Sequence, residues 1–222
     1  MYQRDYILRM IEQITYVVAT KVFQLKQMKK YEDALAAMGE LFTRLSLPSS
    51  NAIRNMSARQ IADMMSVSGI LPVEKVKAAA ELIEEEGSIR ELMEEPETAA
   101  AAYAKALQLH LLAYAEDDED KGAERIDRLL DKLTYRNLPY ESGLPIVRYY
   151  ERTGQFSRAE DVLFLTWNEY PSEELLAGGL NMYERLLLKP DSELEAGGLP
   201  RGEVLDGRTQ LQQLANEWDQ AK

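Results

Sequence analysis

The chain has 222 residues, no cysteine and a formal net charge of −12, with 45% hydrophobic and 29% charged residues as in ordinary globular proteins. The lack of cysteine excludes disulfides, iron–sulfur clusters, thiolate zinc sites and cysteine nucleophiles, and the acidic balance argues against a nucleic-acid partner because it repels phosphate. No stretch of about 18 apolar residues is present, and charged residues interrupt the N-terminal segment, so we predict a cytoplasmic protein with no secretory signal and no membrane contact.

The first segment, residues 1–48, predicts an N-terminal helical hairpin. Over 2–29, apolar residues recur at intervals of three and four, which is the period of one helix face. A second series covers 31–45 and ends before Pro48, which cannot continue a helix. Because the connection between the two series is short, we expect the helices to be antiparallel.

Residues 49–95 predict a different pattern, an insert of shorter helices. Gly69, Pro72 and Gly87 interrupt the apolar spacing. Pro72 suits the first turn of a helix, and Gly87 suits the position just after its end. Residues 49–95 are therefore predicted to form short helical pieces.

Within this insert, residues 57–82 approximate a helix-turn-helix. Ser57 and Gln60 have the spacing of a capping box at a helix N-terminus. Two features oppose a DNA-binding role: Ser66 stands where the turn glycine is expected, and residues 51–87 carry four basic residues against six acidic ones. A DNA-linked regulator is therefore the alternative function and not the preferred one.

Residues 96–188 predict further antiparallel helical hairpins. In this segment Ser157 and Glu160 have capping-box spacing, and Ser172 is placed to cap the next helix. Residues 189–222 predict a Pro- and Gly-rich loop followed by a C-terminal helix. β-branched residues do not alternate anywhere, so we expect an all-α fold with a helix content above roughly 60%, its four segments forming one compact unit.

One hairpin, residues 144–171, resembles a tetratricopeptide repeat. The matching positions are Tyr150, Gly154, Phe156, Ala159, Leu163 and Pro171. The segment KKYEDALAAMGELFTRLSLP repeats part of this pattern, with Lys29 in place of the turn glycine. The two matches are not separated by a whole number of repeats, so the resemblance implies an irregular tetratricopeptide-like array of antiparallel helical hairpins.

The opening of the chain carries a second resemblance. The segment QRDYILRMIEQ, followed by the YEDAL hairpin, resembles an uncharacterised helical family of Firmicutes bacteria with tetratricopeptide-like folds. This resemblance implies a fold, but no activity that would pass to any residue of this chain.

Residues that carry chemistry are sparse. His110 is the single histidine, and without cysteine or a second histidine it makes no familiar zinc site. The acidic segment 116–120 lacks the glycine and glutamate spacing of an EF-hand loop. Nucleotide-binding and serine-hydrolase motifs are also missing. We predict no catalytic residue, no metal and no cofactor; an unrecognised enzyme would need a cleft that joins His110 to several carboxylates.

The preferred function is therefore a non-catalytic helical adaptor that binds a protein or peptide segment. Arg148, Tyr149 and Arg152 fall off the apolar face of their helix and are the candidate partner-binding residues. Arg148 and Arg152 lie four residues apart and would hold an acidic segment of the partner. Two alternatives stay open: the arginines pair with neighbouring glutamates, and the partner is a second copy of the chain.

Overall fold

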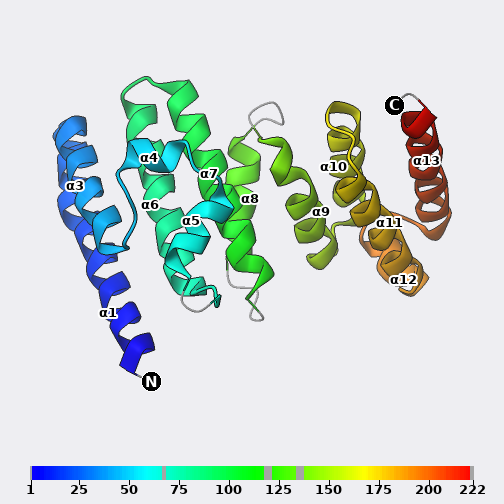
Figure 1. Cartoon of the computed structure of the whole chain (residues 1–222), viewed down its shortest axis with the longest axis horizontal. Coiled ribbons are helices and arrows are strands. Elements are labelled where there is room, and N and C mark those ends of the chain that lie inside the picture. Colours follow the sequence, from blue (N-terminus) through cyan, green and yellow to red (C-terminus); the bar gives the residue numbers. More distant parts are fainter. Residues whose placement is uncertain (1, 67–68, 118–121, 134–137, 221–222) are drawn as a thin grey trace. The chain divides into compact units, whose positions relative to one another are not determined.

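The computed structural model describes residues 2–66, 69–117, 122–133 and 138–220 (Figure 1). Of these residues 82% are helical and none forms a β-strand, which confirms the all-α prediction. The chain forms two compact units, Met1–Asn137 (unit 1) and Leu138–Lys222 (unit 2). The expectation of one compact unit is wrong, and the boundary falls inside the predicted segment 96–188. None of the described helices combines the length and the apolar character needed to cross a bilayer.

Unit 1 begins with a long helix that contains a π-helical turn. The described helices of this unit are α1 (Tyr2–Val17), the π-helix η1 (Val18–Val22), α2 (Phe23–Gln27), α3 (Tyr31–Arg44), α4 (Ser50–Arg54), α5 (Ala58–Met65), α6 (Val73–Leu92), α7 (Pro96–Ala115) and α8 (Ala123–Lys132). Because α1, η1 and α2 follow one another without a break, the predicted helix over 2–29 is present. It packs against α3, as expected for the N-terminal hairpin.

The centre of unit 1 is a pair of long helices, α6 and α7, that pack against each other along their length. The predicted helix end at Gly87 is wrong, since α6 continues through this residue to Leu92. A Cβ atom at Gly87 would lie 2.8 Å from the Tyr103 ring, so glycine here allows α7 to approach closely. Residues 49–95 are therefore not an insert of short helices only, because their last part forms half of the central pair.

Unit 2 consists of a short 3₁₀ helix and five α-helices within its described residues. They are η3 (Tyr140–Ser142), α9 (Gly143–Arg152), α10 (Phe156–Glu169), α11 (Glu173–Leu187), α12 (Asp191–Ala196) and α13 (Arg201–Gln220). As predicted, Ser172 caps α11 by accepting a hydrogen bond from the Leu175 amide at 3.2 Å. The loop predicted over 189–200 is wrong in part, because α12 forms there around the fully buried Leu194.

Three of the helical hairpins share one turn geometry. The second residue after the first helix has a positive φ in each: 57° at Lys29, 61° at Glu94 and 74° at Gly154. The amide of the following residue donates to the carbonyl five positions earlier, which is a Schellman arrangement. Lys29 therefore adopts the conformation that the glycine of the matching repeat position adopts, although a side chain disfavours it.

Each of these turns is followed by a buried alanine. Ala34, Ala99 and Ala159 lie five residues after the left-handed residue and are at most 3% exposed. Each alanine amide also donates to the carbonyl of the residue just before its helix begins. A methyl group at this position allows the two helices of a hairpin to pack closely.

The two predicted capping boxes have opposite outcomes. At Ser57 the box is present: its hydroxyl accepts from the Gln60 amide at 3.1 Å, and Gln60 accepts from the Ser57 amide at 2.8 Å. At Ser157 the prediction is wrong, because α10 already begins at Phe156. The Ser157 amide donates instead to the Gly197 carbonyl at 3.1 Å, which joins the α9–α10 turn to the end of α12.

Candidate functional site

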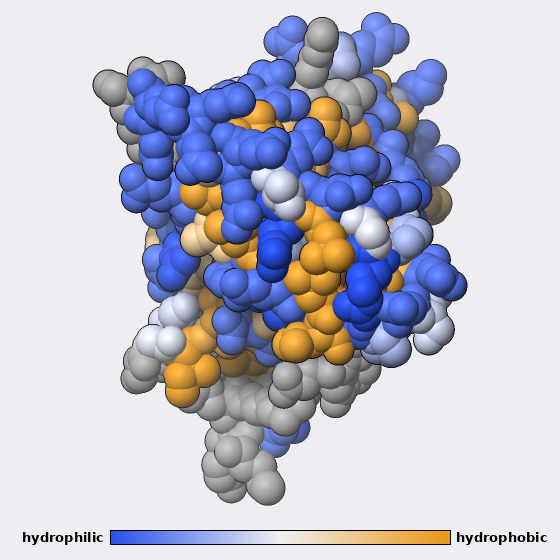
Figure 2. Space-filling model, turned by 90° about the vertical axis from the view of Figure 1, so that its right-hand side faces the viewer, coloured by the Kyte–Doolittle hydropathy of each residue, from blue (hydrophilic) through white to orange (hydrophobic). Residues whose placement is uncertain are grey.

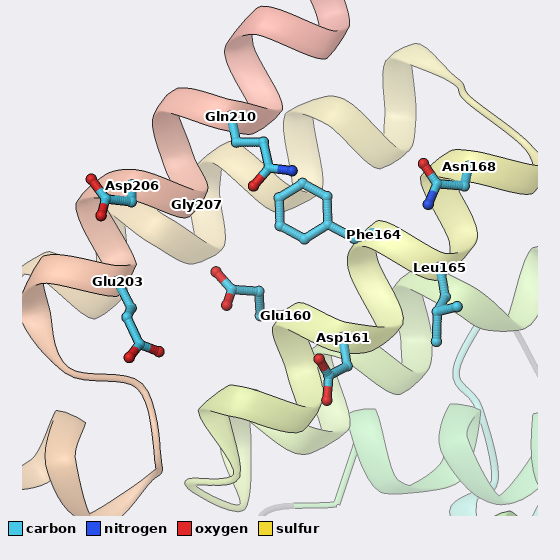
Figure 3. Close-up of a pocket in the computed structure, with 9 residues that line it drawn as sticks. All are labelled: Glu160, Asp161, Phe164, Leu165, Asn168, Glu203, Asp206, Gly207 and Gln210. Carbon is cyan, nitrogen blue, oxygen red and sulfur yellow. The ribbon is translucent and has the colours of Figure 1, made fainter.

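A cavity of about 560 Å³ lies between α10 and α13 in unit 2 (Figure 3). Helix α10 contributes Glu160, Asp161, Phe164, Leu165 and Asn168. Helix α13 contributes Glu203, Asp206, Gly207 and Gln210. The spacing of three and four residues places each set on one face of its helix. Figure 3 shows Glu160 and Phe164 extending from α10 toward α13, and Gln210 extending back toward α10.

The lining of this cavity is acidic and partly apolar. Four carboxylates line it, and no lysine or arginine is among its described lining residues. Phe164 is half-buried, and the neighbouring Leu165 is 46% exposed. Figure 2 shows one face of the molecule, which is mostly hydrophilic with some hydrophobic residues gathered near its centre. The cavity therefore offers negative charge beside apolar surface, which suits a cation attached to an apolar chain.

Glu160 lines the cavity and is held in place by a residue of α11. The Tyr183 hydroxyl donates a hydrogen bond to Glu160 Oε1 at 2.6 Å. Gly207 leaves room for this contact, since a Cβ atom there would lie 2.5 Å from the Tyr183 hydroxyl and would collide with Glu160 Oε1. Three helices thus fix the position of one carboxylate.

The surroundings of Glu160 disfavour its negative charge. Burial raises the pKa of the Glu160 carboxyl, and the nearby carboxylates of Glu203 and Asp161 raise it further. The hydrogen bond from Tyr183 lowers this pKa without outweighing the other causes. Burial also raises the pKa of Tyr183, so its hydroxyl stays protonated and remains a donor. A cation in the cavity would offset the cost of the Glu160 charge.

Both tryptophans of the chain lie at this pair of helices. Trp167 on α10 and Trp218 on α13 have ring centroids 5.7 Å apart in an edge-to-face arrangement. Trp167 is adjacent to the lining residue Asn168. Intrinsic tryptophan fluorescence therefore reports on α10 and α13 and on little else.

Residues 1–216 match the model of a family of unknown function, DUF6483. The chain belongs to this family. No curated protein and no solved structure matches it. The match extends over both units, and it agrees with the predicted membership of an uncharacterised family.

Of the three predicted partner-binding residues, two are exposed and one is buried. Arg148 and Arg152 are exposed on α9, as predicted. Tyr149 is only 2% exposed, so its assignment to a binding surface is wrong. Its ring packs 5.5 Å from that of Tyr150, because the apolar face of α9 is wider than its spacing indicated. The neighbouring Glu151 forms a two-bond ion pair with Arg185 of α11, at 2.6 and 2.7 Å.

His110 is buried in unit 1. It is 5% exposed, and its Nε2 lies 3.7 Å from Glu84 Oε2. Among the described residues, no group of three or more His, Asp or Glu side chains is arranged to hold a metal ion. Of the acidic segment 116–120, Asp117 accepts a hydrogen bond from Lys77 at 2.5 Å, and residues 118–120 lie outside the described part.

Sequence reasoning missed the cavity because its two walls lie on helices that are distant in the chain. The local signal was present, since Glu160 and Asp161 precede Phe164 and Leu165 by one helical turn. Glu160 was assigned to a capping box instead. The correct start of α10 would have left its carboxylate without a local partner.

Proposed function

We propose that this protein is a non-catalytic cytoplasmic adaptor that binds a basic peptide segment in the cavity between α10 and α13. The observation that carries the proposal is a cavity lined by four carboxylates and an aromatic ring, without a basic side chain among its described lining residues. Its volume of about 560 Å³ lies within the range of sites that hold compact ligands or single side chains.

Each part of the cavity has a counterpart in such a segment. A lysine or arginine side chain would meet Glu160 and Glu203, and its charge would compensate the raised pKa of Glu160. The ring of Phe164 would contact the same cation or the apolar stem that carries it. The side-chain amides of Asn168 and Gln210 would pair with the peptide backbone.

The tetratricopeptide-like arrangement is part of the same proposal. Support comes from the shared turn at Lys29, Glu94 and Gly154 and from the buried alanine that follows each turn. Arrays of helical hairpins commonly present surfaces to peptide partners, which is an argument from fold and not from the site.

The alternative of a DNA-linked regulator has less support. The second helix of the proposed helix-turn-helix is α6, whose residues pack against α7, α3 and α1. A recognition helix needs an exposed face to enter the major groove. Lys77, one of the few basic residues of 57–82, is occupied by Asp117 at 2.5 Å. The alternative of an enzyme also has less support, since His110 is not among the residues that line either described cavity.

The test is a calorimetric titration of the protein with two short peptides, with tryptophan fluorescence as a second signal for binding in the cavity. One peptide alternates lysine or arginine with leucine, and the other has glutamate at every basic position. We expect a saturable change with the basic peptide only. Saturable binding of the acidic peptide alone would overturn the proposal and favour the exposed surface of Arg148 and Arg152.

Charge variants locate the site. The double variant Glu203→Gln with Asp206→Asn should weaken binding of the basic peptide roughly tenfold or more, about the effect of one lost charge pair of ~1.4 kcal/mol. Glu174→Gln with Glu184→Gln changes the net charge equally on exposed positions of α11 outside the cavity. Equal weakening by both double variants would mean that only the overall charge attracts the peptide.

Glu160→Gln should weaken binding of the basic peptide and stabilise the free protein against unfolding. The amide oxygen still accepts from Tyr183, while the cost of burying a charge near Glu203 and Asp161 disappears. The pKa of Glu160 is raised in the folded protein, so the stability of the free protein falls as pH rises through this pKa and the carboxyl becomes charged. Binding of the basic peptide changes in the opposite direction, because it needs the charged carboxylate and is lost as pH falls through the same pKa. Urea denaturation and peptide titration at several pH values check both directions; an unchanged pH profile in the variant would contradict the assigned role.

A further inference from the structure

A second cavity, of about 320 Å³, lies between α6, α7 and α8 in unit 1. Its two long walls carry opposite charges. Helix α6 presents Glu81, Glu84 and Glu85, and helix α8 presents Arg125, Arg128 and Lys132. Glu84 and Glu85 follow Glu81 by three and four residues, and Arg125 and Lys132 lie three residues before and four residues after Arg128, so each set lies on one helix face.

Several of these charges are already paired, and the pairing is uneven. The Arg125 guanidinium is shared by two carboxylates, with Nη1 3.1 Å from Glu84 and Nη2 3.4 Å from Glu81. Glu85 is held by Lys26 at 2.7 Å. One cation therefore serves two carboxylates at the Arg125 end of the cavity, which leaves that end with excess negative charge.

The other end of the cavity, at Arg128, has an excess of positive charge. The Arg128 side chain is exposed at the cavity and forms no ion pair or hydrogen bond with the described residues. Lys132 on the next turn is occupied by Glu91 at 2.7 Å and by the face of the Tyr103 ring at 4.2 Å. The cavity thus has an unpaired positive group on α8 and a surplus carboxylate on α6.

His110 of α7 approaches this wall from behind Glu84, without lining the cavity itself. It is 5% exposed, and its Nε2 lies 3.7 Å from Glu84 Oε2. Burial alone would raise the pKa of Glu84, but His110 and Arg125 outweigh burial and lower it, so the carboxylate stays charged.

We propose that this cavity binds a small zwitterion, with its ammonium group toward Glu81 and Glu84 and its carboxylate on Arg128. The guanidinium of Arg128 offers a carboxylate two parallel hydrogen bonds. A ligand with net charge would leave one wall uncompensated, whereas a zwitterion matches both. The volume is near the lower end for ligand sites and suits a molecule of amino-acid size.

The experiment is a calorimetric titration of the full chain with L-glutamine, L-leucine and L-serine at millimolar concentration. Each is compared with its N-acetylated form, which lacks the ammonium group, and its C-amidated form, which lacks the carboxylate. We expect at least one zwitterion to bind and to raise the melting temperature, and both blocked forms to bind at least tenfold more weakly. Absence of binding by all three zwitterions, or equal binding of a blocked form, overturns the proposal.

Variants assign the two ends. Arg128→Gln should weaken the bound zwitterion at least tenfold and leave its C-amidated form unaffected. Arg59→Gln removes another exposed arginine of unit 1, on α5 outside the cavity, and should change neither. If the Arg128→Gln variant is as thermally stable as the wild-type protein and binds the zwitterion with the same affinity, Arg128 does not hold the carboxylate and the proposal fails.

Discussion

Replacing Ala159 with leucine is expected to lower the free energy of unfolding by about 1–3 kcal/mol. Ala159 is fully buried on α10, five residues after the left-handed turn residue Gly154. Helices α9 and α10 pack against each other more extensively than any other pair of described helices in unit 2. The three added carbon atoms would therefore force the helices apart or force side chains into strained rotamers. Urea denaturation followed by tryptophan fluorescence measures the effect locally, because Trp167 lies on the same helix.

The matched control for this variant is Ala177→Leu. Ala177 is exposed on α11, so the same added volume meets solvent there and the expected change lies within about 0.5 kcal/mol. A urea midpoint unchanged by Ala159→Leu would show that α9 and α10 do not pack as described, and it would remove the repeat match at this hairpin.

Replacing Gly197 with alanine is expected to cost a similar 1–3 kcal/mol. The added Cβ would collide with the Phe156 ring and lie 2.7 Å from the Gly154 carbonyl oxygen. A flexible side chain would move aside, but a backbone carbonyl in a tight turn has little freedom to do so. The hydrogen bond from the Ser157 amide to the Gly197 carbonyl at 3.1 Å would be stretched as well.

Gly202→Ala serves as the control for this second variant. Gly202 lies in the first turn of α13 with open space around its Cα, so alanine should stabilise the helix by roughly 0.5–1 kcal/mol. Urea denaturation of both variants under the same conditions shows whether each one lowers or raises the free energy of unfolding. Stabilisation by Gly197→Ala would mean that the end of α12 does not contact the α9–α10 turn.

Local features of the sequence determined most of the helices. Periodic apolar residues predicted the helical hairpins, and the caps at Ser57 and Ser172 were correct because a serine hydroxyl bonds to an amide only two or three residues away. Gly154 was also predicted as a turn, since a positive φ is a property of one residue and its neighbours. Such interactions need no knowledge of distant parts of the chain.

The tertiary structure decided the features that depend on distant neighbours. Gly87 was predicted to end a helix, yet the ring of Tyr103 on the next helix uses the space that its missing side chain leaves. Tyr149 was predicted to be exposed, but the helices around α9 cover both sides of its apolar stripe. Glu160 gains its neighbours Tyr183 and Glu203 only when α11 and α13 fold against α10. A sequence states which side chains lie on a helix face, whereas packing free energy summed over the whole unit selects which helix that face meets.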